Sequence, residues 1–284
     1  MTARDDPPAP PPAVPGFDPA DPQAVACYDE LPLWSAMAGL LLLEHVGLRA
    51  RRVLDVGCGT GFPLLELAGR LGPRASLCGV DTWGAALGRA RAKARAWGIG
   101  HATLARADGA ALPLRGGAFD LVVSNLGLHN FADPEATLRE CRRVLVPGGE
   151  LALTSNLAGH MRELYEAYEV VLAERGDRAA LGRLREHVER RGSVEGIARR
   201  LQGCGFRVTA AHERLLPMRF AGADALLSHH FIRLGFLPAW EEIVDEPARP
   251  AVLAALRSRL DRVAAGRGEL LLTVPMACVL AEAV

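Results

Sequence analysis

A carboxylate followed by three glycines at alternate positions is the part of this sequence best suited to chemistry. The group lies between a short apolar stretch and an apolar pattern with helical spacing, which predicts a strand, a tight turn and a helix. Glycine allows a backbone turn with positive φ and lets a ligand approach the main chain closely. The free N–H groups at the start of such a helix attract a carboxylate or a phosphate. The turn is therefore a candidate ligand site, and its residues are Asp55, Gly57, Gly59 and Gly61.

Two classes of cofactor bind to a turn of this kind, and the spacing of the glycines separates them. Folds that bind a dinucleotide such as NAD use Gly-x-Gly-x-x-Gly, with the pyrophosphate at the start of the helix. This sequence has Asp-x-Gly-x-Gly-x-Gly and lacks the third glycine of that fingerprint. The run from Arg52 to Leu65, RVLDVGCGTGFPLL, instead resembles the first motif of the class I S-adenosylmethionine-dependent methyltransferases.

The resemblance continues in order over residues 50–156. In that family the glycine loop wraps the methionyl part of the cofactor, and an acid at the end of the next strand binds the ribose hydroxyls. Asp81 matches this acid, since it stands about 20 residues after the last glycine. Asp108 resembles the residue that accepts a hydrogen bond from the adenine amino group. Residues 119–125 resemble the strand that ends beside the transferred methyl, and residues 143–151 resemble the turn into the fifth strand.

A helical lid over the cofactor is a further expectation. The apolar pattern of residues 25–46 is helical, with Tyr28 and Trp34 near its start. Many small-molecule methyltransferases fold N-terminal helices over the cofactor and close the pocket with an aromatic side chain. The alternative is that both aromatics are ordinary packing residues. Together, the resemblance implies cofactor contacts from Tyr28, Asp55, Gly57, Cys58, Gly59, Gly61, Asp81, Thr82, Ala107, Asp108, Gly109, Ser124 and Asn125.

The alternation of strand and helix patterns predicts an α/β fold with a parallel sheet and right-handed crossovers. We expect a Rossmann-like three-layer sandwich of seven strands, in which the last strand is antiparallel and a helical cap is added. The sixth and seventh strands are expected at residues 206–215 and 270–280, with a helical stretch at 224–237 between them. The family usually joins these strands by a short link, whereas this chain inserts about 50 residues, and long insertions usually carry function. Residues 157–191 and 221–267 are therefore expected to form a cap that shapes the acceptor pocket.

Residues 1–22 are rich in proline and lack the apolar residues needed for a core. We expect a disordered tail there, and a recognition segment for a partner protein is the alternative. The remaining residues, 23–284, are expected to form one methyltransferase domain.

The composition argues against several classes of partner. Lys and Arg number 33, Asp and Glu also number 33, and 5% of residues are aromatic, so nothing indicates nucleic-acid binding. The six cysteines include no Cys-x-x-Cys pair, which favours reduced thiols over disulfides or a metal site. No signal peptide or membrane-spanning run is apparent, so we expect a cytoplasmic protein without membrane insertion. The sequence predicts neither the oligomeric state nor the identity of the acceptor.

Methyl transfer needs an acceptor held in line with the methyl, a site without water, and a base where the acceptor carries a proton. Positioning supplies about 7 to 11 kcal/mol, whereas a general base supplies roughly 3 to 5 kcal/mol. Positioning should therefore dominate. The candidate bases are His129, just after the fourth strand, and His229 and His230 in the expected cap, of which His230 falls on the apolar stripe of residues 224–236. For each of them a purely structural role is the alternative.

Three functions remain open at this point. The first is methyl transfer to a small-molecule acceptor, since residues 126–134 resemble the methyltransferases of ubiquinone and menaquinone synthesis and their relatives. The second is a nucleic-acid methyltransferase of the same fold, which the neutral charge and the absence of an Asn-Pro-Pro-Tyr run disfavour. The third is a cofactor-binding assembly partner that has lost catalysis, although the cofactor positions look intact.

Overall fold

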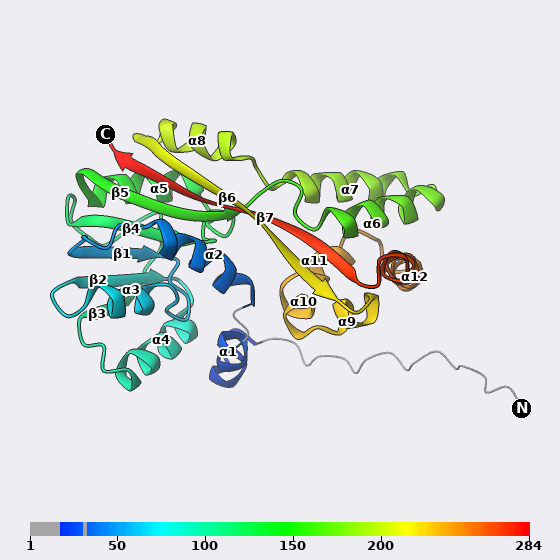
Figure 1. Ribbon diagram of the computed structural model, residues 1–284, viewed down its shortest axis with the longest axis horizontal. Helices are drawn as coiled ribbons and strands as arrows, with labels where there is room; N and C mark the ends of the chain where they lie inside the picture. Colours follow the sequence, from blue (N-terminus) through cyan, green and yellow to red (C-terminus); the bar gives the residue numbers. More distant parts are fainter. Residues whose placement is uncertain (1–17, 31–32) are drawn as a thin grey trace, which may run out of the picture.

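A seven-stranded sheet forms the centre of the computed structural model, which describes residues 18–30 and 33–284 (Figure 1). The strands are β1 (Arg52–Val56), β2 (Ser76–Asp81), β3 (Ala102–Arg106), β4 (Phe119–Asn125), β5 (Leu145–Asn156), β6 (Phe206–Phe220) and β7 (Leu270–Ala283). Their order in the sheet is β3-β2-β1-β4-β5-β7-β6. The first five pair in parallel, and β7 runs antiparallel to both of its neighbours. The expected mostly parallel sheet with an antiparallel last strand is therefore confirmed.

Helices cover both faces of the sheet because side chains alternate along each strand. In β1, Val53 joins the apolar cluster on one face, and Leu54 and Val56 join the cluster on the other. The first cluster includes residues of α2 (Leu33–His45), α3 (Leu64–Leu71) and α4 (Gly84–Ala96). The second includes residues of α5 (Pro134–Val144) and α8 (Val194–Gly203). The result is the expected three-layer sandwich.

The last two strands form a long ribbon that extends beyond the sheet. β6 and β7 pair from Phe206 opposite Ala283 to Phe220 opposite Leu270, so both are longer than the sequence pattern indicated. Helices gather around the far end of the ribbon: α6 (Arg162–Glu174), α7 (Arg178–Glu189), α9 (Ala223–Ser228), α10 (His230–Gly235), α11 (Leu237–Glu241) and α12 (Arg249–Arg267) (Figure 1). The buried Trp240 of this cap belongs to the same apolar cluster as the sheet face with Val53. The cap and the sheet thus share one continuous core.

The helical stretch expected at residues 224–237 is broken. The backbone of His229 is extended, with ψ 125°, so the segment forms α9, α10 and the start of α11 instead of one helix. Because the chain turns at His229, residues on either side of it do not share one helical axis. The apolar stripe expected along a single helix therefore does not predict which way His230 points.

The predicted lid segment is also divided, into α1 (Pro22–Asp29) and α2. Pro22, at the end of the expected tail, is instead the first helical residue, and the carboxylate of Asp21 caps the helix. Residues 1–17 of the expected tail lie outside the described part of the chain. Among the described helices, none is both long and apolar enough to cross a membrane. The described residues also contain no cluster that could hold a metal ion.

Candidate functional site

The glycine turn after β1 leaves open room for a ligand at one of its three glycines. All three have positive φ, 79° at Gly57, 51° at Gly59 and 99° at Gly61. A Cβ on Gly61 would lie 3.0 Å from a methyl carbon of Leu65, so this glycine allows close helix packing. A Cβ on Gly59 would meet no atom of the described residues within 4 Å. Gly59 is therefore the point at which a ligand can approach the main chain.

Asp81, at the end of β2, is bound to this turn. Its Oδ2 accepts a hydrogen bond from the Gly59 amide at 2.8 Å, and its Oδ1 accepts from the Trp83 amide at 2.8 Å. Each carboxylate oxygen can accept a second hydrogen bond, so Asp81 keeps the capacity to bind two ligand hydroxyls. The adjacent Thr82 is exposed and accepts a hydrogen bond from Arg106 through its carbonyl.

Asp55 is a buried carboxyl beneath the same turn. Neither of its oxygens makes a hydrogen bond of normal geometry to a described residue. Burial, and then the charge of Asp81, raise the pKa of Asp55 to about 8, and the nearby amide of Leu64 only partly opposes this shift. Burial also raises the pKa of the neighbouring Cys58 thiol, which is thus a packing residue and not a nucleophile.

Helix α1 is fastened beside the turn. The rings of Tyr28 and Trp83 meet edge to face with centroids 5.5 Å apart. Burial, and then the charge of Asp81, raise the pKa of Tyr28, which places this side chain close to the carboxylate. Asp29 binds Arg89 at 2.9 Å and Lys93 at 2.6 Å, both on α4. The expected lid thus lies near the predicted cofactor site, while the side chain of Trp34 lies outside the described part of the structure.

The loop after β3 carries the predicted adenine-binding residues. The Ala107 amide donates to the Asp81 carbonyl at 3.1 Å, and Asp108 accepts a hydrogen bond from the Ala110 amide at 2.9 Å. A Cβ on Gly109 would lie 2.9 Å from Cγ2 of Thr137, so only glycine fits there.

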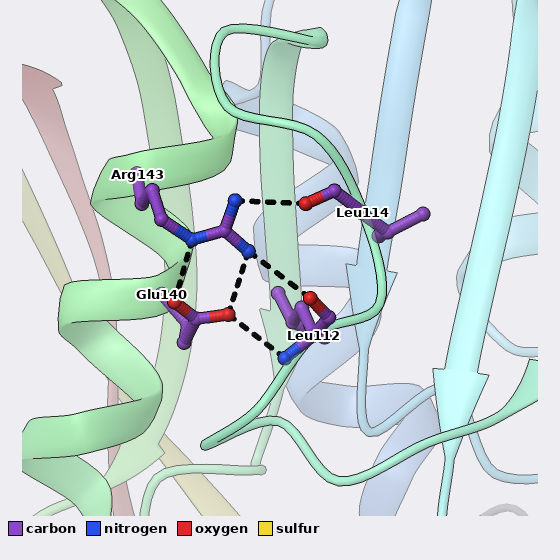
Figure 2. A network of polar contacts seen from close by, with 4 residues as sticks. All are labelled: Leu112, Leu114, Glu140 and Arg143. Carbon is purple, nitrogen blue, oxygen red and sulfur yellow. Dashed lines mark hydrogen bonds and ion pairs between the residues drawn. The ribbon is translucent and has the colours of Figure 1, made fainter.

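A polar network holds the next part of this loop against α5 (Figure 2). Arg143 donates to the carbonyls of Leu112 and Leu114, at 3.0 and 2.7 Å. Glu140 accepts from the Leu112 amide at 2.8 Å and binds Arg143 at 2.6 Å. The network therefore fixes the loop by its main chain, while the buried side chain of Leu112 joins the apolar core.

Ser124 and Asn125 brace the end of β4. The Ser124 hydroxyl donates to the carbonyl of Val56 at 2.8 Å. Asn125 accepts from the Thr154 hydroxyl at 2.7 Å and donates to the Ser35 carbonyl at 3.0 Å. Both residues thus join the carboxyl end of β4 to its surroundings, and their predicted contact with a cofactor stays a prediction. The next residue, Leu126, has a positive φ of 59°, which for leucine is a strained conformation typical of functional sites.

His129 stands three residues after Leu126 and is exposed to solvent over only part of its surface. Its Nε2 lies 2.8 Å from the Ser155 hydroxyl, which donates its own hydrogen to the Asn156 carbonyl at 3.0 Å. The network is satisfied when Nε2 carries the proton, which leaves Nδ1 as the basic nitrogen. Partial burial of the ring lowers the pKa of His129, the Asn156 carbonyl opposes that shift, and the charges of Arg191 and Arg200 add to it. His129 is therefore neutral at neutral pH and able to take a proton.

The two histidines of the cap differ from each other. His229 has a buried Nδ1 without a hydrogen-bond partner among the described residues, and its ring lies against Phe220 at 5.7 Å. Burial, and then the charge of His230, lower the pKa of His229. His230 is half-buried. The sequence names both histidines as candidates and favours His230 from its place on the apolar stripe, whereas the break at His229 gives His229 the buried ring nitrogen.

The residues around Gly59 fit the expected cofactor. Open room at the turn, the buried carboxyl of Asp55, the carboxylate of Asp81 and the ring of Tyr28 lie around one place at the carboxyl edge of the sheet. The sequence pattern does not single out Asp29, which joins α1 to α4. The one available signal was that its partner Lys93 is the only lysine in the chain.

The chain is similar to known proteins along most of its length. A family model described as a methyltransferase domain matches residues 54–153. The chain is 32% identical to nocamycin O-methyltransferase of Saccharothrix syringae over 241 residues, which are 80% of this chain and 83% of that protein. It is 42% identical to demethylmenaquinone methyltransferase of Thermus thermophilus over 120 residues, 42% of this chain and 52% of that protein. The chain thus spans about half the length of the second relative.

Solved structures share the fold. The YcgJ protein from Bacillus subtilis matches with a TM-score of 0.56 and 18% identity, over 87% of this chain and 98% of that chain. A SAM-dependent methyltransferase from Aquifex aeolicus matches with a TM-score of 0.52 and 21% identity, over 67% of this chain and 91% of that chain.

Proposed function

This chain belongs to the family of S-adenosylmethionine-dependent methyltransferases, and from that membership we propose that it transfers a methyl group to a small-molecule acceptor. The observation that carries the proposal is the open room above Gly59, with the carboxylate of Asp81 bound to the same turn. A cofactor can lie against the main chain there and place its hydroxyls on Asp81. Helix α1 stands beside it, held by Asp29.

When bound, S-adenosylmethionine supplies a methyl group on a positively charged sulfur, already activated for displacement. In our proposal the glycine turn holds the methionyl part, Asp81 the ribose hydroxyls and Asp108 the adenine amino group. Tyr28 and Trp83, whose rings meet edge to face, exclude water from the site. Excluding water strengthens the electrostatic interactions inside the pocket.

The cap, residues 157–191 and 221–267, is proposed to hold the acceptor against the carboxyl edge of the sheet. Ligands of open α/β sheets bind at that edge. Where the acceptor carries a proton, Nδ1 of His129 is the proposed base, because the bond from Nε2 to Ser155 leaves Nδ1 free to accept it. Holding the acceptor in line remains the larger contribution, about 7 to 11 kcal/mol.

The named relatives support a small organic acceptor. One is an O-methyltransferase and another methylates demethylmenaquinone, according to their names. The balanced charge of this chain, 33 basic against 33 acidic residues, does not favour nucleic acid. We further propose that residues 23–284 act as one domain and that the enzyme works in the cytoplasm.

Transfer of label from methyl-labelled S-adenosylmethionine tests the proposal. The purified protein is incubated separately with a small-molecule extract, total nucleic acid and total protein from the same cells, with Gly59→Val as the matched control. We expect label in an organic product of the first incubation alone, identified by mass spectrometry. Label in nucleic acid would instead favour the nucleic-acid methyltransferase. Binding of the cofactor without transfer to any fraction would favour a non-catalytic partner.

A further inference from the structure

Arg191 is a cation without an acidic partner at the edge of the sheet where we propose that the acceptor binds. It lies between α7 and α8 and takes part in none of the ion pairs among the described residues. Its Nε is buried and makes no hydrogen bond to a described residue. By contrast, Arg183 and Arg185 of the same segment bind carboxylates at 3.3 and 3.1 Å. A partly buried guanidinium without a counter-charge is costly unless a ligand supplies one.

Backbone contacts fix Arg191 at the same edge as the candidate base. Nε2 of His129 lies 3.4 Å from the carbonyl oxygen of Asn156, the last residue of β5. Two residues further along, the Ala158 amide donates to the carbonyl of Gly192 at 3.0 Å. Since Gly192 directly follows Arg191, the main chain of Arg191 lies at the same end of β5 as His129, and the charge of Arg191 acts on the His129 ring.

Neutral groups surround the guanidinium. Its carbon lies 6.0 Å from the centroid of the Tyr165 ring, and the Tyr165 hydroxyl lies 3.0 Å from Nε2 of His187. Burial, and then the charge of Arg191, lower the pKa of His187 to about 4 and that of His160 to about 2. Both rings are therefore uncharged at neutral pH. The cluster combines one fixed positive charge with rings that can form hydrogen bonds, including the Tyr165 hydroxyl, and among the described residues no carboxylate pairs with Arg191.

A structural role explains the position of Arg191 only in part. It follows the C-terminal end of α7, where a cation gains roughly 0.3 to 1 kcal/mol from the helix dipole. That interaction is available to an exposed side chain and does not require the buried, unpartnered Nε. Contact with the face of Tyr165 likewise leaves the charge uncompensated.

We propose that the guanidinium of Arg191 binds a carboxylate of the acceptor, so that the substrate of this enzyme is an organic acid. The inference rests on the proposed function. Arginine matches a carboxylate through two parallel N–H···O bonds. A single negative charge fits better than a phosphate dianion, because the other cation near His129, Arg200, is already paired with Glu135 at 2.8 Å.

A cavity of about 200 Å³ between α6 and α7 is not the proposed site, although Tyr165 also lines it. Its walls carry three glutamates, Glu166, Glu169 and Glu189, against two arginines, Arg162 and Arg185, and Arg185 is already paired with Glu169, so the net charge does not favour a carboxylate.

Binding of benzoate and of its uncharged isostere benzamide tests the proposal. The protein, saturated with S-adenosylhomocysteine and labelled with ¹⁵N at its histidines, is titrated with each compound and the imidazole signals are followed by NMR. We expect benzoate to shift the signals of His129 and His187 in a saturable way and benzamide to shift neither. Arg191→Gln should weaken benzoate binding at least about tenfold, Arg191→Lys should retain part of it, and the exposed neighbour Arg190→Gln should bind as the wild type does.

Equal responses to benzoate and benzamide in the wild-type protein, or no response to benzoate, would overturn the proposal without use of any variant. Unchanged benzoate binding by Arg191→Gln would do the same. S-adenosylhomocysteine binding, measured separately by calorimetry, should be equal in all four proteins. If the wild-type protein does not bind S-adenosylhomocysteine, the proposed function is contradicted. If it binds S-adenosylhomocysteine but does not prefer benzoate to benzamide, only the role of Arg191 is contradicted.

Discussion

The carboxylate of Asp29 lies 2.6 Å from the ammonium group of Lys93, with side chains only 9% and 15% exposed. This pair joins α1 to α4 beside the glycine turn, and Arg89 adds a second bond to the same carboxylate at 2.9 Å. Burial alone would raise the pKa of Asp29, but hydrogen bonds from Lys93, Thr60 and Arg89 outweigh it and lower that pKa. Thr60 belongs to the glycine turn, so α1 and the turn meet at this carboxylate.

Asp29→Ala should therefore loosen the lid. We expect S-adenosylhomocysteine to bind about tenfold more weakly, a change of roughly 1.4 kcal/mol, because α1 loses its attachment to α4. The matched control is Glu169→Ala, which removes an exposed pair with Arg185 in the cap and should leave affinity unchanged. Full affinity in Asp29→Ala, measured by calorimetry, would show that α1 is not a lid.

Valine at Gly59 should mainly remove cofactor binding, whereas valine at Gly61 should mainly lower the stability of the fold. Gly59→Val places its side chain in the open room of the turn, so it should abolish cofactor binding while urea unfolding shows only the modest cost of a strained backbone, about 1 to 3 kcal/mol. Gly61→Val would press on Leu65 and Ala90, at 3.0 and 3.1 Å from its Cβ, and should destabilise the fold more strongly. If Gly59→Val is folded and binds normally, the turn is not the cofactor site.

Asp55 should make the protein less stable as pH rises. Its pKa is raised from 3.8 to about 8, so the folded protein binds more protons than the unfolded chain between those values. The neutral carboxyl of Asp55 contributes its full stabilisation below the pKa that it has in the unfolded chain. This stabilisation is lost as pH rises through the higher pKa of the folded protein. Urea unfolding should show the wild type losing up to about 1.4 kcal/mol per pH unit more than Asp55→Asn over that window.

Asp120→Asn is the control for this measurement. Burial raises the pKa of Asp120, but hydrogen bonds from Arg52 and the Arg51 amide outweigh that effect and lower it. Asp120 therefore stabilises the folded protein above the pKa that it has in the unfolded chain. This stabilisation is lost only as pH falls through the lower pKa of the folded protein. A wild type and Asp55→Asn with parallel stability profiles from acid to neutral pH would refute the role assigned to Asp55.

His129→Asn should lower turnover of an acceptor that carries a proton by roughly 10² to 10⁴ without changing cofactor affinity. Because the pKa of His129 is lowered, wild-type turnover should rise with pH through a value below the ordinary 6.5. Ser155→Ala removes the partner of Nε2 and should cause a smaller loss. If His230→Ala abolishes turnover and His129→Asn does not, the base lies in the cap.

The sheet and the glycine turn could be predicted from the sequence because both depend on local patterns. Buried strands such as Val53 to Val56 and glycines at alternate positions are visible within a few residues of one another. The length of the β6–β7 ribbon could not be predicted from the sequence. It depends on the pairing of Phe220 with Leu270, which the local pattern does not reveal. The break at His229 also lacks a proline or glycine signal.

The site shows the same division. Gly59 and Asp81, which stand 22 positions apart at the ends of neighbouring strands, are joined by a hydrogen bond, but the bond between Asp29 and Lys93 joins side chains 64 positions apart. Arg191 carried no signal, because its environment comes from α6, α7 and the end of β5. The cap also cannot be removed as a unit, since Leu256 and Trp240 lie in the core that it shares with the sheet. Point substitutions are therefore the better test of its role.

Calorimetric titration with S-adenosylmethionine, S-adenosylhomocysteine and NAD tests the central claim most directly. We expect the first two to bind the wild-type protein and NAD to show no binding. Asp81→Ala should weaken binding by roughly 1.5 to 3 kcal/mol through loss of a charged hydrogen-bond acceptor, and Asp81→Asn, which keeps one acceptor oxygen, should lose less. Binding of NAD without binding of S-adenosylmethionine would contradict the assignment of this site.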